Sequence, residues 1–432
     1  MALLCVGWPA SPAVAQVTLI DWQNTAGGLF TTGANWNGGQ APVGSSLGAR
    51  FDVEGNYAVQ FPTDAAVVVG ELQTAIVGSS GITFRPADAS ADAVLQIEGP
   101  LTHSGAGLTL GSFVNAGVHV ESGATSVAGG AIFTISNKSA LTTNRLDIAD
   151  GIVGKASRLV LNSTEASDLG DVHIGETPGG VRESDLEVTA GSQAFLTSLS
   201  VGRHPAPGAD AISTVSGRVT VASGGEANFG HPDSSRSAFV AVTSTGEIEF
   251  GGPAAVHASG RLKSFGGHLA FLGGLTVAGG VVEGLAGFTR EFAVGTGISL
   301  TAGALLDLAE ADLLLDDGHS LQVSGNSTLI ADGGLTLGPT SSVLLEFGGS
   351  IPAAPWIQLA GDATLAGSLS FSVGPSLNVL LGDSFPLLAA SSFEGAFNLT
   401  SAPPLPGGQA WQMTVDQGVL YARVVSGGLA GD

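Results

Sequence analysis

The chain is poor in charge, in aromatic rings and in cysteine, and each shortage excludes a class of protein. Only 12% of its 432 residues are charged and 6% are aromatic, although 44% are hydrophobic. A hydrophobic share of this size can fill a large core, which argues against a disordered chain. There is no run of ~18 uninterrupted apolar residues, so we expect no membrane-spanning helix. The single cysteine, Cys5, excludes a disulfide framework and a zinc site with several cysteine ligands.

Basic residues are also scarce. Lysine and arginine together number 14 against 37 acidic residues, and the net charge is −23. Such a charge repels nucleic-acid phosphates and anionic lipids, so we expect neither as a partner. High solubility or a weak attraction of divalent cations is the more natural consequence.

Glycine, in contrast, is abundant, with 66 residues. The glycines follow no period of three, which excludes a collagen-like chain. Many of them end short segments in which apolar and polar residues alternate, and this pattern is typical of a β-strand that runs into a turn. Clear examples of the pattern are residues 118–124, 186–192, 219–225 and 321–326.

A longer repeat is visible as well. Gly175, Gly202 and Gly230 each follow an apolar residue, and the two intervals between them are almost equal. Both intervals fall within the length of about 20 to 30 residues that one turn of a parallel β-solenoid takes, and stacked turns share one core. We therefore predict an all-β parallel β-solenoid, or β-helix, with the right-handed winding that is commoner for parallel crossovers. Residues 304–317 also fit a helix, but the following Gly318 and the strand-like residues 321–323 favour a strand.

The largest aromatic residues divide the chain. A narrow coil has little room for indole rings, and no tryptophan or tyrosine occurs between residues 58 and 355. We predict an N-terminal cap over residues 16–70, solenoid repeats over 71–350, and a β-sandwich-like C-terminal unit with a tail over 351–432. Residues 1–15 are largely apolar and end in Ala13-Val14-Ala15, so they are interpreted as a signal peptide cleaved after Ala15.

The segment 21–42, DWQNTAGGLFTTGANWNGGQAP, resembles the opening of a group of large secreted bacterial proteins. This group includes proteins with autotransporter-associated β-strand repeats and the PEP-CTERM or dockerin-tailed proteins of planctomycete-like bacteria. Residues 365–370, 382–388, 393–397 and 405–411 fit the same group, so the resemblance covers nearly the whole chain beyond the signal peptide. It implies an extracellular β-solenoid with a surface or matrix role and without catalytic residues.

Two acidic groups are the candidate cation sites. Glu183, Asp185 and Glu187 alternate along one strand and point outward, about 6.6 Å apart, which is too far for one calcium ion without ligands from a neighbouring turn. Asp168 and Asp171, with Glu165 and Glu176 nearby, surround a loop. We interpret both groups as solvated surface, with calcium as the alternative cofactor. Before Gly318, acidic residues have the composition of a turn, namely Asp312, Asp316 and Asp317.

No constellation for catalysis is recognisable. The eight histidines are scattered, and the nucleophile-elbow, phosphate-loop and calcium-nonapeptide motifs are absent. A carbohydrate-active solenoid would need converging carboxylates beside a basic residue, for which Arg182, Arg203 and Arg218 are the nearest candidates. Trp22 and Trp36 would suit either a sugar-stacking platform or the core of the cap, and we favour the core.

Taken together, these patterns predict an exported, non-enzymatic structural or adhesive protein of a cell surface or extracellular matrix. Polysaccharide or other surface proteins are the expected partners. The alternative is a carbohydrate-binding or carbohydrate-active β-helix that resembles a polysaccharide lyase or hydrolase.

Overall fold

The structure is a computed structural model, and it describes most of the chain between residues 17 and 427. The residues within this range that it does not describe are 112, 150–155, 176–183, 203–210, 216–217, 222–225, 231–237, 266–267, 286–290, 294–296, 309–311 and 316. The signal peptide predicted for residues 1–15 therefore lies outside the described part.

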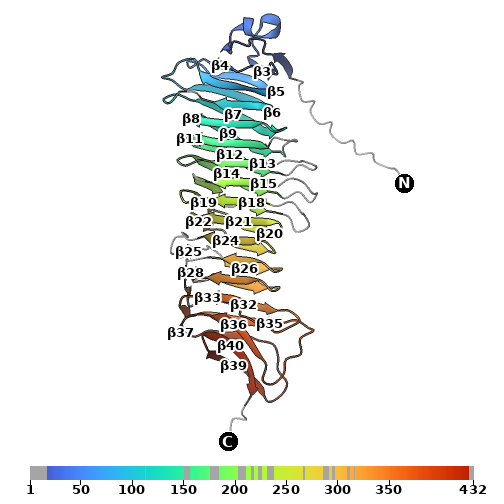
Figure 1. Cartoon of the computed structure of the whole chain (residues 1–432), viewed down its shortest axis with the longest axis vertical. Helices are drawn as coiled ribbons and strands as arrows, with labels where there is room; N and C mark the ends of the chain where they lie inside the picture. The colour runs from blue at the N-terminus through green and yellow to red at the C-terminus, as the bar shows by residue number, and fades with distance from the viewer. Residues whose placement is uncertain are drawn as a thin grey trace, which may run out of the picture.

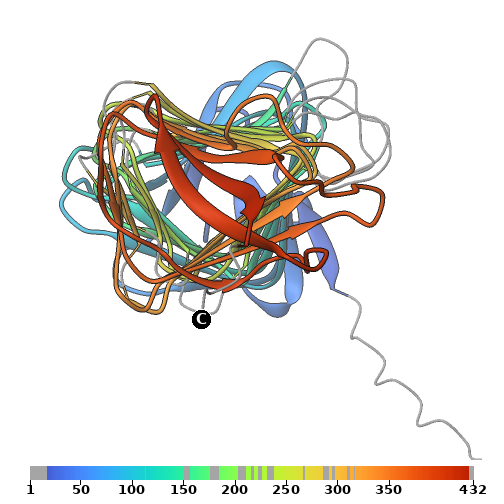
Figure 2. The same ribbon diagram turned by 90° about the horizontal axis from the view of Figure 1, so that it is seen from below.

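The described chain is an all-β parallel β-solenoid, as predicted (Figure 1). Short strands wind round three faces, and successive turns superpose when the molecule is viewed from its C-terminal end (Figure 2). The turns differ in length: the turn from Leu262 to Val282 is short, and the turn from Ile357 to Leu388 is long. Helical structure in the described residues is limited to two short 3-10 helices, η1 (Gly33–Asn35) and η2 (Asn37–Gly39). Among those residues, no helix has the length and apolar character needed to cross a membrane.

The first face consists of one long ladder followed by a second, five-stranded sheet. The long ladder contains the initial parts of β3 (Gly44–Phe51), β5 (Val67–Pro86), β6 (Ala93–Leu110) and β7 (Val118–Ala128), then β9 (Ala140–Thr143), the initial parts of β12 (Ser167–Ile174) and β14 (Gln193–Val201), and β16 (Arg218–Val221), β19 (Glu247–Phe250) and β22 (His268–Phe271). The second sheet contains β25 (Glu291–Ala293), β28 (Asp312–Leu315), β31 (Leu335–Leu337), β34 (Ala363–Leu365) and β37 (Phe393–Gly395).

The second face runs almost the whole length of the column. It contains β1 (Thr18–Asp21), later parts of β3, β5, β6 and β7, then β10 (Arg145–Ile148), the ends of β12 and β14, and β17 (Ala227–Phe229), β20 (Ala254–His257), β23 (Leu275–Ala278), β26 (Gly297–Thr301), β29 (Ser320–Ser324), β32 (Ser342–Phe347), β35 (Ser368–Val373) and β38 (Asn398–Ser401).

The third face completes each turn. It contains β2 (Gly28–Leu29), β4 (Tyr57–Phe61), the ends of β5 and β6, then β8 (Ile132–Asn137), β11 (Ser157–Ser163), β13 (Ser184–Val188), β15 (Ala211–Val215), β18 (Ala238–Val242), β21 (Gly260–Phe265), β24 (Val281–Leu285), β27 (Leu305–Asp307), β30 (Thr328–Ala331), β33 (Ile357–Leu359) and β36 (Ser384–Ala389). A hairpin of β39 (Gln409–Asp416) and β40 (Val419–Ser426) pairs antiparallel with β36.

The glycine repeat of the sequence marks one corner of successive turns. Gly175, Gly202 and Gly230 have φ angles of +67°, +65° and +74°, and this left-handed conformation suits residues without a Cβ atom. Gly202 donates a hydrogen bond to the carbonyl of Ile174, and Gly230 donates to that of Val201, one turn earlier. The predicted glycine period is therefore one turn of the coil in this region.

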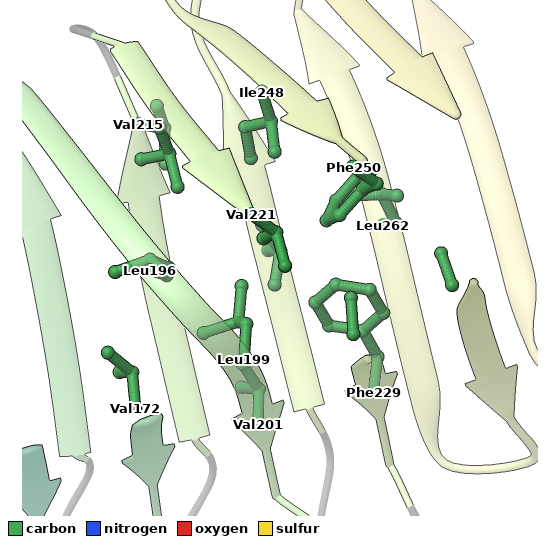
Figure 3. Close-up of a cluster of buried hydrophobic side chains, with 14 of the residues drawn as sticks. Val172, Leu196, Leu199, Val201, Val215, Val221, Phe229, Ile248, Phe250 and Leu262 are labelled. Carbon is green, nitrogen blue, oxygen red and sulfur yellow. The ribbon is translucent and has the colours of Figure 1, made fainter. Parts of the chain in front are cut away.

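The predicted strands are confirmed too. The four glycine-ended segments form β7, β13, β16 and β29, and the doubtful segment 304–317 contains β27 and β28. Inside, side chains from all three faces form one thin apolar column (Figure 3). Phe229, Phe250 and Phe271 follow one another along it: Phe229 meets Phe250 edge to face with ring centroids 5.8 Å apart, and Phe250 stacks on Phe271 with centroids 5.0 Å apart. A narrow interior filled by such side chains matches the absence of indole rings from the middle of the sequence.

The two ends of the column hold the large rings. At the N-terminal end the residues assigned to a cap wind as the first turns of the same coil, since β1 pairs in parallel with β3. At the C-terminal end the parallel pairing continues past residue 350, from β33 to β38. Antiparallel pairing between described strands is confined to β36, β39 and β40. The tryptophans thus mark the two ends of the column. The coil itself continues past residue 350, and its last turns are long enough to surround the large rings.

Candidate functional site

Charged side chains on the outer faces pair with each other between neighbouring turns. Partners in a parallel ladder lie about 4.8 Å apart, so a basic residue on one turn meets an acidic residue on the next. Arg218 on β16, for example, approaches Glu247 and Glu249 on β19 at 3.4 and 3.6 Å. Most of the few basic residues in the described chain form such ion pairs, and each pair connects one turn to its neighbour.

The acidic row predicted on β13 is one of these paired positions. Asp185 and Glu187 lie on the strand as expected, but Arg158 of the preceding turn lies 3.0 Å from Asp185 and 3.5 Å from Glu187. The side chain of Asp185 is only 11% exposed, so this part of the row is an ion-paired surface and differs from the freely solvated one expected. Glu183 lies outside the described residues.

Arg158 was missed because nothing in its local sequence connects it with β13. It precedes Asp185 by the same interval that separates Gly175 from Gly202, which is one turn. A search of the sequence for oppositely charged residues one turn apart would have found this pair.

The second predicted acidic group does not converge. Asp168 belongs to the first face, where it pairs with Thr142, whereas Asp171 belongs to the second face. A carboxylate oxygen of Asp168 accepts the Gly170 N–H at 3.4 Å, and one of Asp171 accepts the Ser198 hydroxyl at 2.7 Å. The Asp168 carboxylate therefore stabilises the corner between the two faces, and the Asp171 carboxylate connects its strand to the next turn. Glu176 lies outside the described residues.

Of the acidic residues predicted to form a turn before Gly318, Asp317 lies in a turn, whereas Asp312 is the first residue of strand β28. Asp312 accepts the Gly334 N–H at 2.6 Å, and Asp317 accepts the Thr340 N–H at 3.0 Å, so each carboxylate connects its segment to the next turn. Asp316 lies outside the described residues. Across the described chain, no three histidine, cysteine, aspartate or glutamate side chains come together as a metal site would require.

One place on the first face brings acids, a guanidinium and an imidazole together. Glu247 and Glu249 point outward from β19, and Arg218 lies on β16, one turn earlier. The Nδ1 atom of His268 on β22, one turn later, lies 3.8 Å from Glu247. Their side chains are between 32% and 48% exposed. Of the three arginines considered from the sequence, Arg218 is thus placed beside carboxylates, while Arg182 and Arg203 lie outside the described residues.

The two N-terminal tryptophans are core residues. Trp22 and Trp36 are both fully buried, with ring centroids 5.0 Å apart in an edge-to-face contact. The Nε1 atom of Trp36 donates to the carbonyl of Phe30 at 2.6 Å. Because neither ring reaches the surface, a sugar-stacking platform at this position is excluded and the core interpretation is confirmed.

Hollows on the described surface include two that bear on ligand binding. The smaller, of about 210 Å³, crosses β23, β26 and β29 on the second face, where Thr276, Ser299 and Gln322 line it. The larger, of about 630 Å³, lies at the C-terminal end between the loop that follows β35 and the loop that follows β38. Neither hollow includes the Arg218 cluster.

The chain matches no protein-family model, no curated protein and no solved structure. The fold is therefore established as a β-solenoid by its own coordinates. The family resemblance noted in the sequence stays a prediction.

Proposed function

We propose that the protein is an exported, non-enzymatic structural or adhesive rod of a cell surface or extracellular matrix. The observation that carries the proposal is the pairing of outer charges between turns. Arg158 joins Asp185 and Glu187, and Arg261 and Lys263 join Glu283. Groups arranged in this way stabilise a column, whereas catalysis needs charged groups that converge on a substrate.

Stiffness is the first part of this role. Each inner strand is hydrogen-bonded to the turn before it and the turn after it, so a bend must break bonds on one face. The continuous apolar column adds to this resistance, because separating two turns would expose buried side chains to water.

Adhesion is the second part, and the second face supplies a surface for it. Residues in register on successive strands form a row, here called the polar row, composed of Asn228, Ala255, Thr276, Ser299 and Gln322, in which every side chain except that of Ala255 is polar. Hydroxyl and amide groups repeated about every 4.8 Å can hydrogen-bond to an extended polysaccharide. The net charge of −23 supports a neutral or cation-bridged matrix partner over nucleic acid.

Export rests on the signal-peptide interpretation of residues 1–15. The chain beyond that segment contains no cysteine, which suits an oxidising exterior. Fractionation of cells that express the full gene tests this part, and retention of the intact protein in the cytoplasm would overturn it.

The role is tested by incubating the protein with a panel of soluble and insoluble polysaccharides, with calcium and with a chelator. We expect retention on at least one insoluble polysaccharide, without release of reducing or unsaturated sugar ends. Calcium should leave the melting temperature unchanged, because Arg158 already lies between Asp185 and Glu187 and pairs with both. Turnover of any member of the panel would overturn the structural assignment.

The Arg218 cluster favours one alternative, a carbohydrate-active β-helix. Glu247 and Glu249 are two residues apart on one strand, so their side chains start about 6.6 Å apart, near the separation used by inverting glycosidases. If the panel shows turnover, E247Q and E249Q should abolish it, while E54Q, at an exposed glutamate outside the cluster, should not. Turnover that survives both cluster variants would exclude this site.

A further inference from the structure

The larger hollow has the size and the walls of a small-molecule site. Its volume of about 630 Å³ lies within the range of ~300–1,000 Å³ that is usual for ligand pockets. Residues 371–375 and 377–379, at the end of β35 and in the loop that follows it, form one wall, and residues 401–406, at the end of β38 and in the loop that follows it, form the other. Both loops lie at the C-terminal end of the column, where the coil gives way to the hairpin (Figure 1).

The walls of this hollow are held in place before any ligand arrives. Pro403, Pro404 and Pro406 restrict the backbone of the second loop, since proline has a fixed φ angle. The Nε1 atom of Trp411 donates to the carbonyl of Pro403 at 2.9 Å. The Trp411 ring in turn packs edge-on against Phe371, with centroids 4.8 Å apart. A loop anchored to the aromatic core in this way loses little conformational entropy when it binds a ligand.

Hydrogen-bonding groups in the hollow are available to a ligand. Ser372, Asn378 and Ser401 line it, are exposed, and make no side-chain hydrogen bond to other described residues. The proline carbonyls add acceptors without N–H donors; those of Pro403 and Pro406 already accept one hydrogen bond each, from Trp411 and from the backbone of Gln409, and keep a second lone pair for a ligand. Leu377 and Val379 contribute apolar surface beside these polar groups. The hollow therefore presents hydrogen-bond partners and hydrocarbon patches side by side.

The absence of charge among the lining residues narrows the class of ligand. A metal ion would require carboxylates, and an acidic sugar or a phosphate would require arginine or lysine, but the lining contains none of these. A proline-rich peptide would require exposed aromatic rings, whereas Phe371, the aromatic residue in the lining, is only 2% exposed. A wholly apolar ligand would desolvate the three polar side chains without replacing their bonds to water.

We propose that this hollow binds a short segment of a neutral saccharide. Sugar hydroxyls would donate to the Asn378 carboxamide oxygen and the proline carbonyls and would exchange bonds with Ser372 and Ser401, while sugar C–H faces would cover Leu377 and Val379. The inference rests on the proposed adhesive function and deepens it, because it names the chemistry of the ligand and one place that holds it.

The test is isothermal titration of the full chain with cellotetraose, maltotetraose and mannotetraose, with trigalacturonate as the charged comparison. We expect at least one neutral tetrasaccharide to bind and trigalacturonate to bind at least tenfold more weakly. The double variant N378A/S401A should weaken binding about tenfold or more. S376A, a neighbouring exposed serine that does not line the hollow, is the matched control and should bind as the parent protein does.

Unchanged circular dichroism and melting temperature show that the double variant is folded, as expected for exposed side chains. Equal binding by the parent protein and N378A/S401A would overturn the site, as would the absence of binding by every neutral tetrasaccharide. Retention on insoluble polysaccharide is measured in parallel. A protein that is retained there but binds no tetrasaccharide contradicts this inference alone, whereas enzymatic turnover contradicts the proposed function.

Discussion

At the scale of single residues, the charged pairs between turns set how stability depends on pH. Glu283 on β24 lies 2.5 Å from Arg261 and 3.1 Å from Lys263, both on β21. Burial alone raises the pKa of Glu283, but hydrogen bonds from Arg261 and Lys263 and their charges outweigh burial and leave the pKa below its ordinary value of 4.5. Because the folded state favours the ionised form, the pair stabilises the fold above about pH 4.5 and loses its effect as the pH falls through the lowered pKa.

We therefore expect E283Q to lower the free energy of unfolding by about 1 kcal/mol at pH 7, near the upper end for partly exposed ion pairs. The difference from the parent protein should shrink as the pH falls below 4.5, where Glu283 becomes protonated first in the unfolded state, and should disappear below the lowered pKa of the folded state. Urea unfolding between pH 3.5 and 7 measures this. E54Q, at an exposed glutamate, is the control and should be nearly neutral. A difference that stays the same at every pH would contradict the electrostatic explanation.

The corner glycines form a second feature at this scale. Gly230 has a φ of +74°, and a Cβ atom there would lie 2.3 Å from the backbone nitrogen of Gly260. Gly303 has a φ of +78°, but a Cβ atom would meet no atom within 4 Å. We expect G303A to cost about 1 kcal/mol from backbone strain, and G230A about 2–4 kcal/mol because the clash is added. Thermal or urea unfolding of both variants checks this, and equal losses would show that steric contact between turns contributes nothing.

At the scale of elements, the ends of the column differ from its middle. Trp22, Phe30 and Trp36 fill the first turns, and η1 and η2 carry Trp36 over the open end of the core. An uncovered end would expose both apolar side chains and unpaired strand edges, which promote association between molecules. Large rings are therefore needed where the column stops, and they are excluded from the middle where the turns are narrow.

The variant W36A should uncouple the first turns from the rest. Removing a buried tryptophan costs about 3–5 kcal/mol, but in a stacked repeat the loss stays close to the affected turn. We expect amide hydrogen exchange to accelerate in β1–β4 while β26–β32 keep their protection. W356A, at the opposite end, is the matched variant and should give the reverse pattern. Uniform acceleration along the chain in either variant would mean that the solenoid unfolds as one cooperative unit.

At the scale of the whole molecule, the column is a stack of interchangeable turns. Leu321 pairs with Ile298 before it and with Val343 after it, so residues 321–342 make one turn. Deleting them should let β32, β33 and β34 replace β29, β30 and β31 in register. We expect a folded protein with the same β-type circular dichroism per residue and a slightly lower melting temperature.

A deletion of half a turn is the control for this experiment. Removing only residues 321–331 places strands of one face against strands of another and disturbs the alternation of inward and outward side chains. This shorter deletion should therefore unfold the C-terminal half, although it removes a smaller part of the chain. If both deletions behave alike, the turns are not independent stacking units.

The strands and the length of a turn could be predicted from the sequence, but the contacts between particular residues of neighbouring turns could not. The alternation in residues such as Leu321 to Val323, and the spacing of Gly175, Gly202 and Gly230, were sufficient to predict strands, turn length and parallel stacking. The candidate sites could not be predicted as well. The pairing of Arg158 with Asp185, and the separation of Asp168 from Asp171 by a corner, depend on which residues of different turns share a rung.

The local features of the fold follow from the order of the residues: side chains alternate with a period of two along each strand, and glycine permits the left-handed corners. The alignment of turns of unequal length, the continuation of the coil beyond residue 350 and the meeting of two loops around the C-terminal hollow became visible in the folded molecule. The physical reason is that alternation and backbone conformation are properties of neighbouring residues. Register and pocket shape arise instead from contacts between residues a full turn or more apart, and loops of variable length decide those contacts.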